Sequence, residues 1–484
     1  LRLGLPDGRD LVLPVPGGAT TVKSGVLRLR YDAAKTTDWT LSGTLDGLKQ
    51  PDFVIGSLSL DGKGRVLHLN SGSARIVGAM GFDAAGLAFR DPRLAQAAGT
   101  SLTGRTVFGW QQGDKLRLRQ IALRAGDLGL SGDIALNLQG LDLAVDGALS
   151  LTAPDVARFS GLAGRPLSGA ADITLTGNLM ARSGAFDLTG TASGRSLGIA
   201  QPMADRLLTG TSDIRVSALR DRTGITLRSF DLQAGGLMAS ASGTVTSKAT
   251  DLSASLTMDD LSVLGQGFGG GLTAEATLAG PPGQRGFSLS GAGHDLRFGS
   301  VTIDPLFAGD TQIALTAREQ DDTFALTEVR LENAALSAQA TETDVAGAYQ
   351  LDGALRDTAR LLPGFPGATS LTGGLRVEPS AYRLDITVAG PGGIAAQTDG
   401  TVARDFSQID LALAGSGQAA VLNTKIAPRS IDGPIRFDVV FSGPPALSSL
   451  SGRISGTGLR FAAPGENLAL EDIALTGDVA GGAV

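Results

Sequence analysis

Hydrophobic and polar residues alternate along most of the chain with a period of two. Runs of five to eight residues carry an aliphatic side chain at every second position and a polar or small residue between. Such alternation indicates a β-strand with one apolar and one wet face. The clearest runs supply candidate residues for a shared apolar surface: Leu136, Leu138, Leu141, Leu143, Leu252, Leu256, Leu272, Leu278, Ile435, Phe437 and Phe441.

Residues typical of turns separate these runs, as in TLTGN, SLSGAG, TLAGPPG and VFSGPP. Glycine adopts positive φ easily, so these segments are expected to be hairpin turns. At about 10–12 residues per strand and turn, the chain would hold about 40 strands. Helical spacing is brief, for example at 154–164 and 356–365, where one or two helical turns are expected before a Gly or Pro.

Three sequence blocks recur in a fixed order, with a period of about 100 residues that shortens in the later copies. Their copies begin at Leu116, Ile225, Phe324 and Tyr382 for the first block, Asp155, Asp259 and Asp357 for the second, and Phe186, Phe287 and Ser449 for the third. The expected repeat units within one continuous region, 1–484, are 1–115, 116–224, 225–323, 324–420 and 421–484. Tandem units of this kind bury their apolar faces against their neighbours.

The pattern predicts an all-β fold, an elongated repeat array. Its form would be a long twisted antiparallel sheet curled into a taco-like hydrophobic groove, with a few short helical turns. The alternation leaves two possibilities open, an apolar face that lines an open trough and one that forms a closed core. Repeat units of about 100 residues argue against a third possibility, a surface adhesin or β-solenoid, whose filled interior would be built from short rungs.

Composition narrows the ligands that such a surface could bind. Only 5% of residues are aromatic, so the lining would be aliphatic and suited to acyl chains. The 41 basic residues are scattered among 48 acidic ones, for a net charge of −7, which argues against nucleic acid as a partner. The chain has no cysteine, which excludes disulfides, and no apolar run of 18 residues.

No pattern suited to catalysis stands out, and no metal or cofactor is expected. His68 and His294 lack partners at metal-ligand spacing, and the glycines of 265–271 do not match a phosphate loop. The acidic pairs Asp259–Asp260 and Asp321–Asp322 fall in expected connections. The chain is therefore expected not to be an enzyme.

The repeated blocks DVARFSGLAGRPLSGAADITLTG and ITLRSFDLQAGGLMASASGTV, and the third block with its LLTGTSDI ending, resemble the TamB family. TamB proteins are translocation and assembly module components within the AsmA-like group. The resemblance covers Leu116–Val484 and, more loosely, the first 115 residues. It implies a β-groove in the periplasm of a Gram-negative bacterium, an N-terminal inner-membrane anchor, and a C-terminal domain that meets the outer-membrane barrel TamA. The chain starts at Leu1 without Met and stops in mid-pattern, so a middle segment is expected.

The resemblance implies a bridge-like conduit that carries phospholipid between the inner and outer membranes and serves outer-membrane biogenesis. Acyl chains would lie against the alternating aliphatic residues. A second hypothesis is an assembly scaffold or chaperone that works with TamA in the insertion or secretion of outer-membrane β-barrel and autotransporter proteins. Exposed strand edges would then pair with client strands.

Overall fold

The computed structural model describes residues 2–3, 10–13, 20–68, 73–137, 143–321 and 323–481. It confirms the all-β class, because the strands pair antiparallel and every helix is short. The chain divides into two units, Leu1–Ala254 and Ser255–Val484. We call them unit 1 and unit 2 and describe each by itself.

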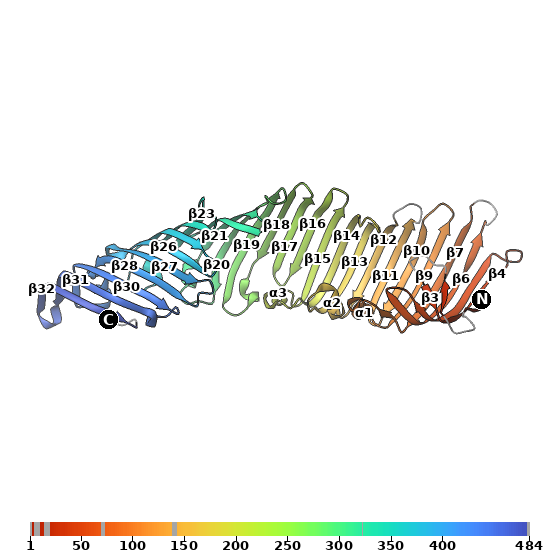
Figure 1. Ribbon diagram of the computed structural model, residues 1–484, viewed down its shortest axis with the longest axis horizontal. Helices are drawn as coiled ribbons and strands as arrows, with labels where there is room; N and C mark the ends of the chain where they lie inside the picture. Colours follow the sequence, from red (N-terminus) through yellow and green to blue (C-terminus); the bar gives the residue numbers. More distant parts are fainter. Residues whose placement is uncertain are drawn as a thin grey trace. The chain divides into compact units, whose positions relative to one another are not determined.

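Unit 1 begins with short strands and continues as a run of longer ones (Figure 1). Its strands are β1 (Arg2–Leu3), β2 (Leu11–Leu13), β3 (Thr20–Val22), β4 (Ser24–Tyr31), β5 (Asp38–Lys49), β6 (Phe53–Leu67), β7 (Arg75–Ala85), β8 (Ala88–Phe89), β9 (Ser101–Gln111), β10 (Leu116–Ala125), β11 (Leu128–Asn137), β12 (Ala144–Ala153), β13 (Ser168–Met180), β14 (Phe186–Gly198), β15 (Thr211–Arg220), β16 (Gly224–Ala234) and β17 (Leu237–Thr246). Its helices are α1 (Pro92–Ala98), η1 (Val156–Phe159), α2 (Ser160–Ala163) and α3 (Pro202–Leu207). Strand β18 (Thr250–Met258) contains the boundary between the units.

Unit 2 continues the same kind of sheet. Its strands are β19 (Phe268–Gly280), β20 (Gly286–Phe298), β21 (Asp310–Gln320), β22 (Thr323–Asn333), β23 (Leu336–Glu342), β24 (Ala348–Leu355), β25 (Thr369–Val377), β26 (Ala381–Gly390), β27 (Ile394–Ala403), β28 (Ile409–Gln418), β29 (Ser430–Asp432), β30 (Pro434–Gly443), β31 (Leu450–Ala463) and β32 (Leu468–Ala480). Its helices are η2 (Leu261–Leu264), η3 (Asp304–Phe307), η4 (Thr358–Arg360), η5 (Pro391–Gly393), η6 (Ala419–Leu422), α4 (Asn423–Ile426), η7 (Leu447–Ser449) and η8 (Pro464–Glu466).

The strands of each unit form an antiparallel meander. In unit 1, β9 to β17 pair in chain order, and β7 pairs with β9. In unit 2, β19 to β28 pair in order, followed by β30, β31 and β32, while β29 pairs with β31. Successive connections in a meander alternate between the two borders of the sheet that the strand ends form, and we call these two borders its edges.

The two edges of each sheet differ in their connections. In unit 1, α1, α2 and α3 all lie along one edge, which we call the helical edge (Figure 1). In unit 2, the connections with η2, η3, η4, η5, η6 and η8 likewise share one edge, while η7 lies on the other. We call the opposite edge of each unit the hairpin edge.

Many of the buried hydrophobic side chains gather at the helical edges, where the helical turns cover the strand ends. They include Ala125, Ala153, Val156, Ala234 and Leu237 in unit 1, and Met258, Leu261, Leu306, Ala335, Ala419, Leu459 and Ala463 in unit 2. Tightly packed small and aliphatic side chains of this kind form the core of a sheet edge. The core of each unit is therefore concentrated along one edge, and the middle of the sheet is less deeply buried.

Three helical turns begin in the same way, and each belongs to a copy of the second sequence block. The Oδ1 atoms of Asp155, Asp260 and Asp357 accept hydrogen bonds from the backbone N–H two residues further on, at 2.9, 2.8 and 3.1 Å. This is the N-cap arrangement that satisfies a free helix-end donor. The helical turns expected at 154–164 and 356–365 are thus confirmed as η1 with α2 and as η4.

The number of strands in each repeat explains why the later repeats are shorter. Strands β10–β15 cover the first full copy of the three blocks, and β16–β21 cover the second. In the described part of the chain, the third copy contains only β22–β25 before the first block starts again at Tyr382 in β26. The third block is the part that this copy lacks, so the compression removes two strands of a meander.

Two segments expected to be turns lie inside strands, which corrects the sequence-based prediction. TLTGN is part of β13 and SLSGAG is part of β20. In β13, Gly177 has φ +145°, and a Cβ there would lie 2.0 Å from the carbonyl oxygen of Asp187. Gly400 of unit 2 has φ +144° and the same 2.0 Å approach to Asp410. Such glycines let a strand bend sharply without ending, so the strands are longer and fewer than the expected 40.

Candidate functional site: the aliphatic face

The register aligns apolar side chains into continuous rows across unit 1. Each residue of a row is the direct cross-strand partner of the next, so neighbouring side chains lie next to one another on the same face. One row is Leu130, Leu151, Ile173, Ala192, Ile214, Leu232 and Ala239. The next row toward the hairpin edge is Gly132, Leu149, Leu175, Gly190, Val216, Phe230 and Ala241. We call the sheet face that carries these rows the aliphatic face.

Unit 2 has an aliphatic face of the same design. One of its rows is Leu289, Leu315, Val329, Ala340, Leu351, Gly373, Ile386, Thr398, Leu413, Val439, Gly452 and Val479. Thr398 is the one hydroxyl in this row, and its Oγ1 is buried without a hydrogen-bond partner. Both units therefore carry an apolar strip along the sheet, which Thr398 alone interrupts in the row given for unit 2.

The middle of the aliphatic face is only half-buried. Leu175 is 42% exposed although it lies in the interior of β13. Its strand neighbours Thr174 and Thr176 belong to the opposite, polar face, which is also exposed. A closed sandwich core would bury such a leucine almost completely, so the aliphatic face of unit 1 remains accessible here.

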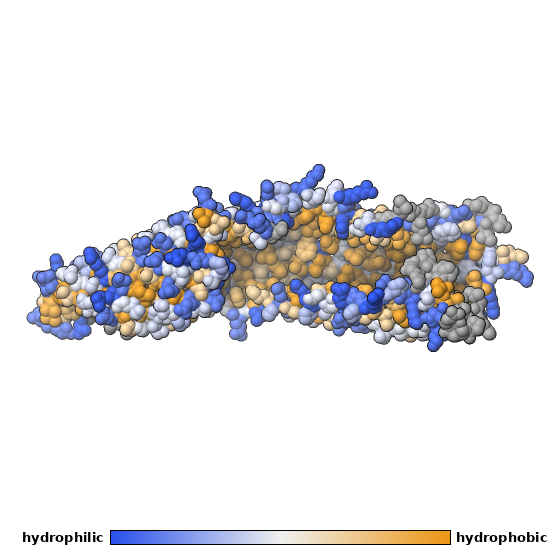
Figure 2. All heavy atoms as spheres, in the orientation of Figure 1, coloured by the Kyte–Doolittle hydropathy of each residue, from blue (hydrophilic) through white to orange (hydrophobic). Residues whose placement is uncertain are grey.

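Surface area and the space-filling view support the same conclusion. The chain exposes 28,209 Å² for a mass of 49.1 kDa. Two compact proteins of half that mass would together expose about 20,000 Å². Figure 2 shows a hollow lined by hydrophobic side chains over the middle strands of unit 1 (β11–β17 in Figure 1), with polar side chains along its rims. An exposed apolar surface of this extent is typical of a binding surface.

Most residues predicted to line a groove lie on the aliphatic face. The pairings place Leu136, Leu272 and Leu278 in its rows, together with Ile435, Phe437 and Phe441 of β30. These side chains, and Leu252 and Leu256 of β18, are half-buried. Leu143 directly precedes β12 and is exposed, whereas Leu138 and Leu141 lie outside the described residues. Lipid binding by any of them is still a prediction.

The row nearest the hairpin edge of unit 1 contains a charge that interrupts the alternating pattern. It runs through Val145, Leu179, Phe186, Arg220, Ile225 and Val245. Leu179, Ile225 and Val245 are 40%, 44% and 39% exposed. The signal in the sequence is an arginine at an inward position of the alternating run SDIRVSALR.

The corresponding place in unit 2 holds a closed ion pair. Glu319 of β21 is paired with Arg285, whose Nε lies 2.7 Å from Oε2. Oε2 also accepts hydrogen bonds from the backbone N–H groups of Gly283 and Arg285, at 2.9 and 3.1 Å. The Glu319 side chain is only 1% exposed. The Arg285 guanidinium, aided by these N–H groups, lowers the pKa of Glu319 to about 2.

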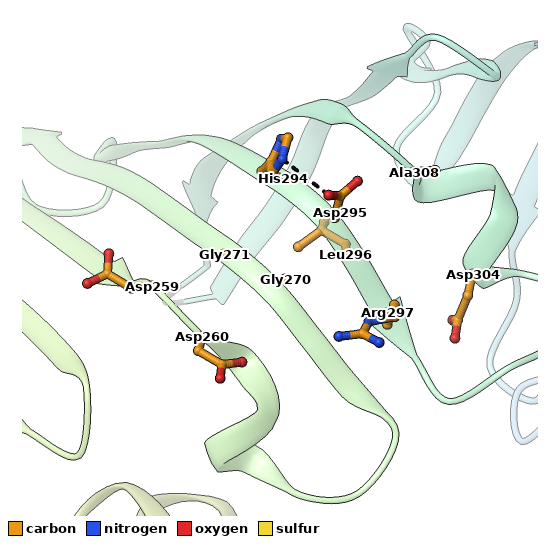
Figure 3. A pocket seen from close by; sticks show the side chains of 10 residues that line it. All are labelled: Asp259, Asp260, Gly270, Gly271, His294, Asp295, Leu296, Arg297, Asp304 and Ala308. Atoms are coloured by element: carbon orange, nitrogen blue, oxygen red, sulfur yellow. Dashed lines mark ion pairs between the residues drawn. The ribbon is translucent and has the colours of Figure 1, made fainter.

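A separate pocket of about 560 Å³ lies near η2 and η3 in unit 2 (Figure 3). His294 has two acidic neighbours: its Nδ1 is 2.7 Å from Asp310, and its Nε2 is 3.2 Å from Asp295. The hydrogen bond with Asp310 and the charge of Asp295 raise the pKa of His294. Other acidic groups here serve the local backbone, since Asp260 caps η2 and Asp304 accepts from Phe298 N–H. Asp295 directly follows His294 in the sequence, whereas Asp310 meets the histidine only through strand register.

Among the described residues, no three His, Asp or Glu side chains are arranged to hold a metal ion. No helix in this part of the chain is long and apolar enough to span a membrane.

The fold and the site define a class, an all-β repeat protein with an accessible aliphatic face. No protein-family model, curated protein or solved structure matches the chain.

Proposed function

We propose that the chain is a conduit for phospholipids, a periplasmic segment that carries them between the inner and outer membranes of a Gram-negative bacterium. The observation that carries this proposal is the half-exposed aliphatic face, whose rows are continuous within each unit. Lipid acyl chains need smooth apolar contact without hydrogen bonds, and each buried methylene contributes about 0.8 kcal/mol. Transport along such a face requires no catalytic residue. The resemblance to TamB proteins supports the same function and implies TamA as a partner of regions outside this segment.

The assembly-scaffold hypothesis finds less support in the same sheet. It requires strands that are unpaired on one side, because client strands would pair with their unsatisfied backbone groups. Strands β10 to β16 are each paired on both sides, so their backbone groups are already used. The accessible feature over this region is the aliphatic face.

A charge placed on the aliphatic face tests the conduit. The chain would be tethered by terminal tags between donor and acceptor vesicles, and transfer of a fluorescent phospholipid would be followed. Leu175→Arg puts a guanidinium in the hollow and should slow transfer at least tenfold, because moving a lipid tail past a charge costs several kcal/mol. Thr176→Arg, on the polar face of the same strand, should transfer like the wild type. Normal transfer by a correctly folded Leu175→Arg variant would count against the conduit.

A further inference from the structure

One position on the aliphatic face differs in charge between the two units. The register equates Arg220 of β15 with Glu319 of β21, since Ile214 and Ile313 occupy the same place in the rows. In unit 2, Glu319 is neutralised by Arg285 across the strand pair. In unit 1, the cross-strand partner of Arg220 is Phe186.

Arg220 therefore faces the aliphatic side without a counter-charge. No ion pair joins it to an acidic side chain in the described part of unit 1, and its side chain is exposed. Its neighbours in the row are apolar and accessible, Ile225 on one side and Leu179 beyond Phe186 on the other. A cation beside apolar side chains matches the chemistry of an amphiphile, whose charged group adjoins its alkyl chains.

The hairpin edge around Arg220 is also basic. Arg222 lies in the same hairpin connection, and Arg182 and Lys248 lie in the hairpins on either side. Two acidic residues are nearby, Asp221 and Asp251. The Asp221 carboxylate accepts hydrogen bonds from Thr223 N–H and hydroxyl at 2.7 and 2.6 Å, which ties it to its own turn. The surplus of positive charge favours an anionic ligand.

We propose that Arg220 forms a headgroup subsite for anionic phospholipids at the hairpin edge of unit 1. A guanidinium binds phosphate oxygens through paired N–H donors, which gives both attraction and orientation. The phosphate contacts Arg220, and the alkyl chains lie over Leu179 and Ile225 and over the rows nearer the middle of the sheet. A net anionic headgroup is favoured over a zwitterionic one because Arg220 repels the ammonium group of a zwitterionic headgroup, at an edge where basic residues outnumber Asp221 and Asp251. This subsite rests on the proposed conduit function.

Local photocrosslinking tests the subsite. A photoreactive residue would replace Ile225, and the purified chain would be irradiated with phosphatidylglycerol or phosphatidylcholine of identical acyl chains. Crosslinking should favour phosphatidylglycerol about fivefold, the scale of one exposed charge contact. Arg220→Gln should abolish this preference. Arg215→Gln, an exposed arginine on the opposite face of β15, should leave it unchanged.

The outcomes separate the subsite from the conduit. If Arg220→Gln crosslinks both lipids as the wild type does, the subsite is wrong and the conduit stands. If no variant crosslinks any lipid, the conduit is wrong and the subsite falls with it. If millimolar inorganic phosphate removes the preference for phosphatidylglycerol and sodium chloride of equal ionic strength does not, Arg220 binds free phosphate in preference to the lipid and the lipid subsite is wrong.

Discussion

Unit 1 and unit 2 carry the same aliphatic face but different hairpin edges. In both units, cross-strand rows of Leu, Val, Ile, Ala and Gly run through successive strands. In the described hairpin connections of β13–β18, the charged residues are mainly basic: Arg182, Asp221, Arg222 and Lys248. In those of unit 2 they are mainly acidic: Arg285, Asp321, Asp344, Glu378, Arg404 and Asp405.

The difference teaches that the repeats preserve the apolar rows while the charges beside them vary. A row position must remain apolar or small to keep the face continuous, whereas an edge position is solvated and tolerates either sign. Position 220 shows the alternatives most clearly. Unit 1 leaves an arginine accessible there, and unit 2 closes the same place with the Arg285–Glu319 ion pair.

The largest expected effects concern the glycines that both units share. Gly177→Ala and Gly400→Ala each force a Cβ to within 2.0 Å of a carbonyl oxygen at positive φ. Each should lower the free energy of unfolding of its own unit by about 2–4 kcal/mol, through backbone strain and overpacking. Chemical denaturation and hydrogen exchange of the two units would measure this.

Two other glycines provide controls for this prediction. At Gly109 of unit 1 and Gly353 of unit 2, the nearest atom to an added Cβ lies 3.8 Å away. Alanine there should change stability by less than about 0.5 kcal/mol. Equal losses at all four positions would mean that the strand bends do not depend on Gly177 and Gly400.

The next effect should appear only in unit 2 and should depend on pH. Glu319 titrates at about 2 in the folded protein against an ordinary value of 4.5. Because the folded pKa is depressed, its stabilisation is present above pH 4.5 and is lost as the pH falls toward 2. Glu319→Gln should therefore speed amide exchange around β19–β22 at neutral pH and make no difference near pH 2. A difference that persists unchanged at pH 2 would contradict an ionised Glu319.

Exchanging the charge arrangement would remove the contrast between the units. The double variant Phe186→Arg with Arg220→Glu places in unit 1 the pair that unit 2 carries as Arg285 and Glu319. We expect it to fold like the wild type and to lose the preference for phosphatidylglycerol at position 225. The single variant Arg220→Glu should lose the same preference. A double variant that kept the preference would show that Arg220 is not its source.

The smallest expected effect is the titration of His294. Its raised pKa means that its stabilising contribution is complete below 6.5 and is lost as the pH rises through the folded value. Asp310→Asn should bring the pKa back toward 6.5 more than Asp295→Asn, because the hydrogen bond with Asp310 is the larger cause. Imidazole NMR titration of the three proteins would test this order.

The local features of the fold could be predicted from sequence because they depend on neighbouring residues. Alternation identified the strands, and helical spacing at 154–164 and 356–365 identified helical turns. Glycine was misleading, because the same residue serves turns and sharp bends within strands. Gly177, inside β13, illustrates the second use.

Features that depend on strand register could not be predicted. Glu319 and Arg285 are 34 residues apart, and His294 meets Asp310 only because β20 pairs with β21. Aligned by sequence, the third block matches Phe186 with Phe287, but the register equates Phe186 with Arg285. A shift of two residues keeps every side chain on its face, so the alternation pattern does not reveal it.

The central claim is that lipid chains lie on the aliphatic face, and crosslinking from its middle tests it most directly. A photoreactive residue would be placed at Ile173, in the central row of unit 1, or at Thr176, on the polar face of the same strand. Irradiation of each protein with phospholipid vesicles should crosslink lipid to position 173, with the crosslinks on the acyl chains. Almost no lipid should be crosslinked to position 176. Equal yields at the two positions, or none at 173, would contradict the claim.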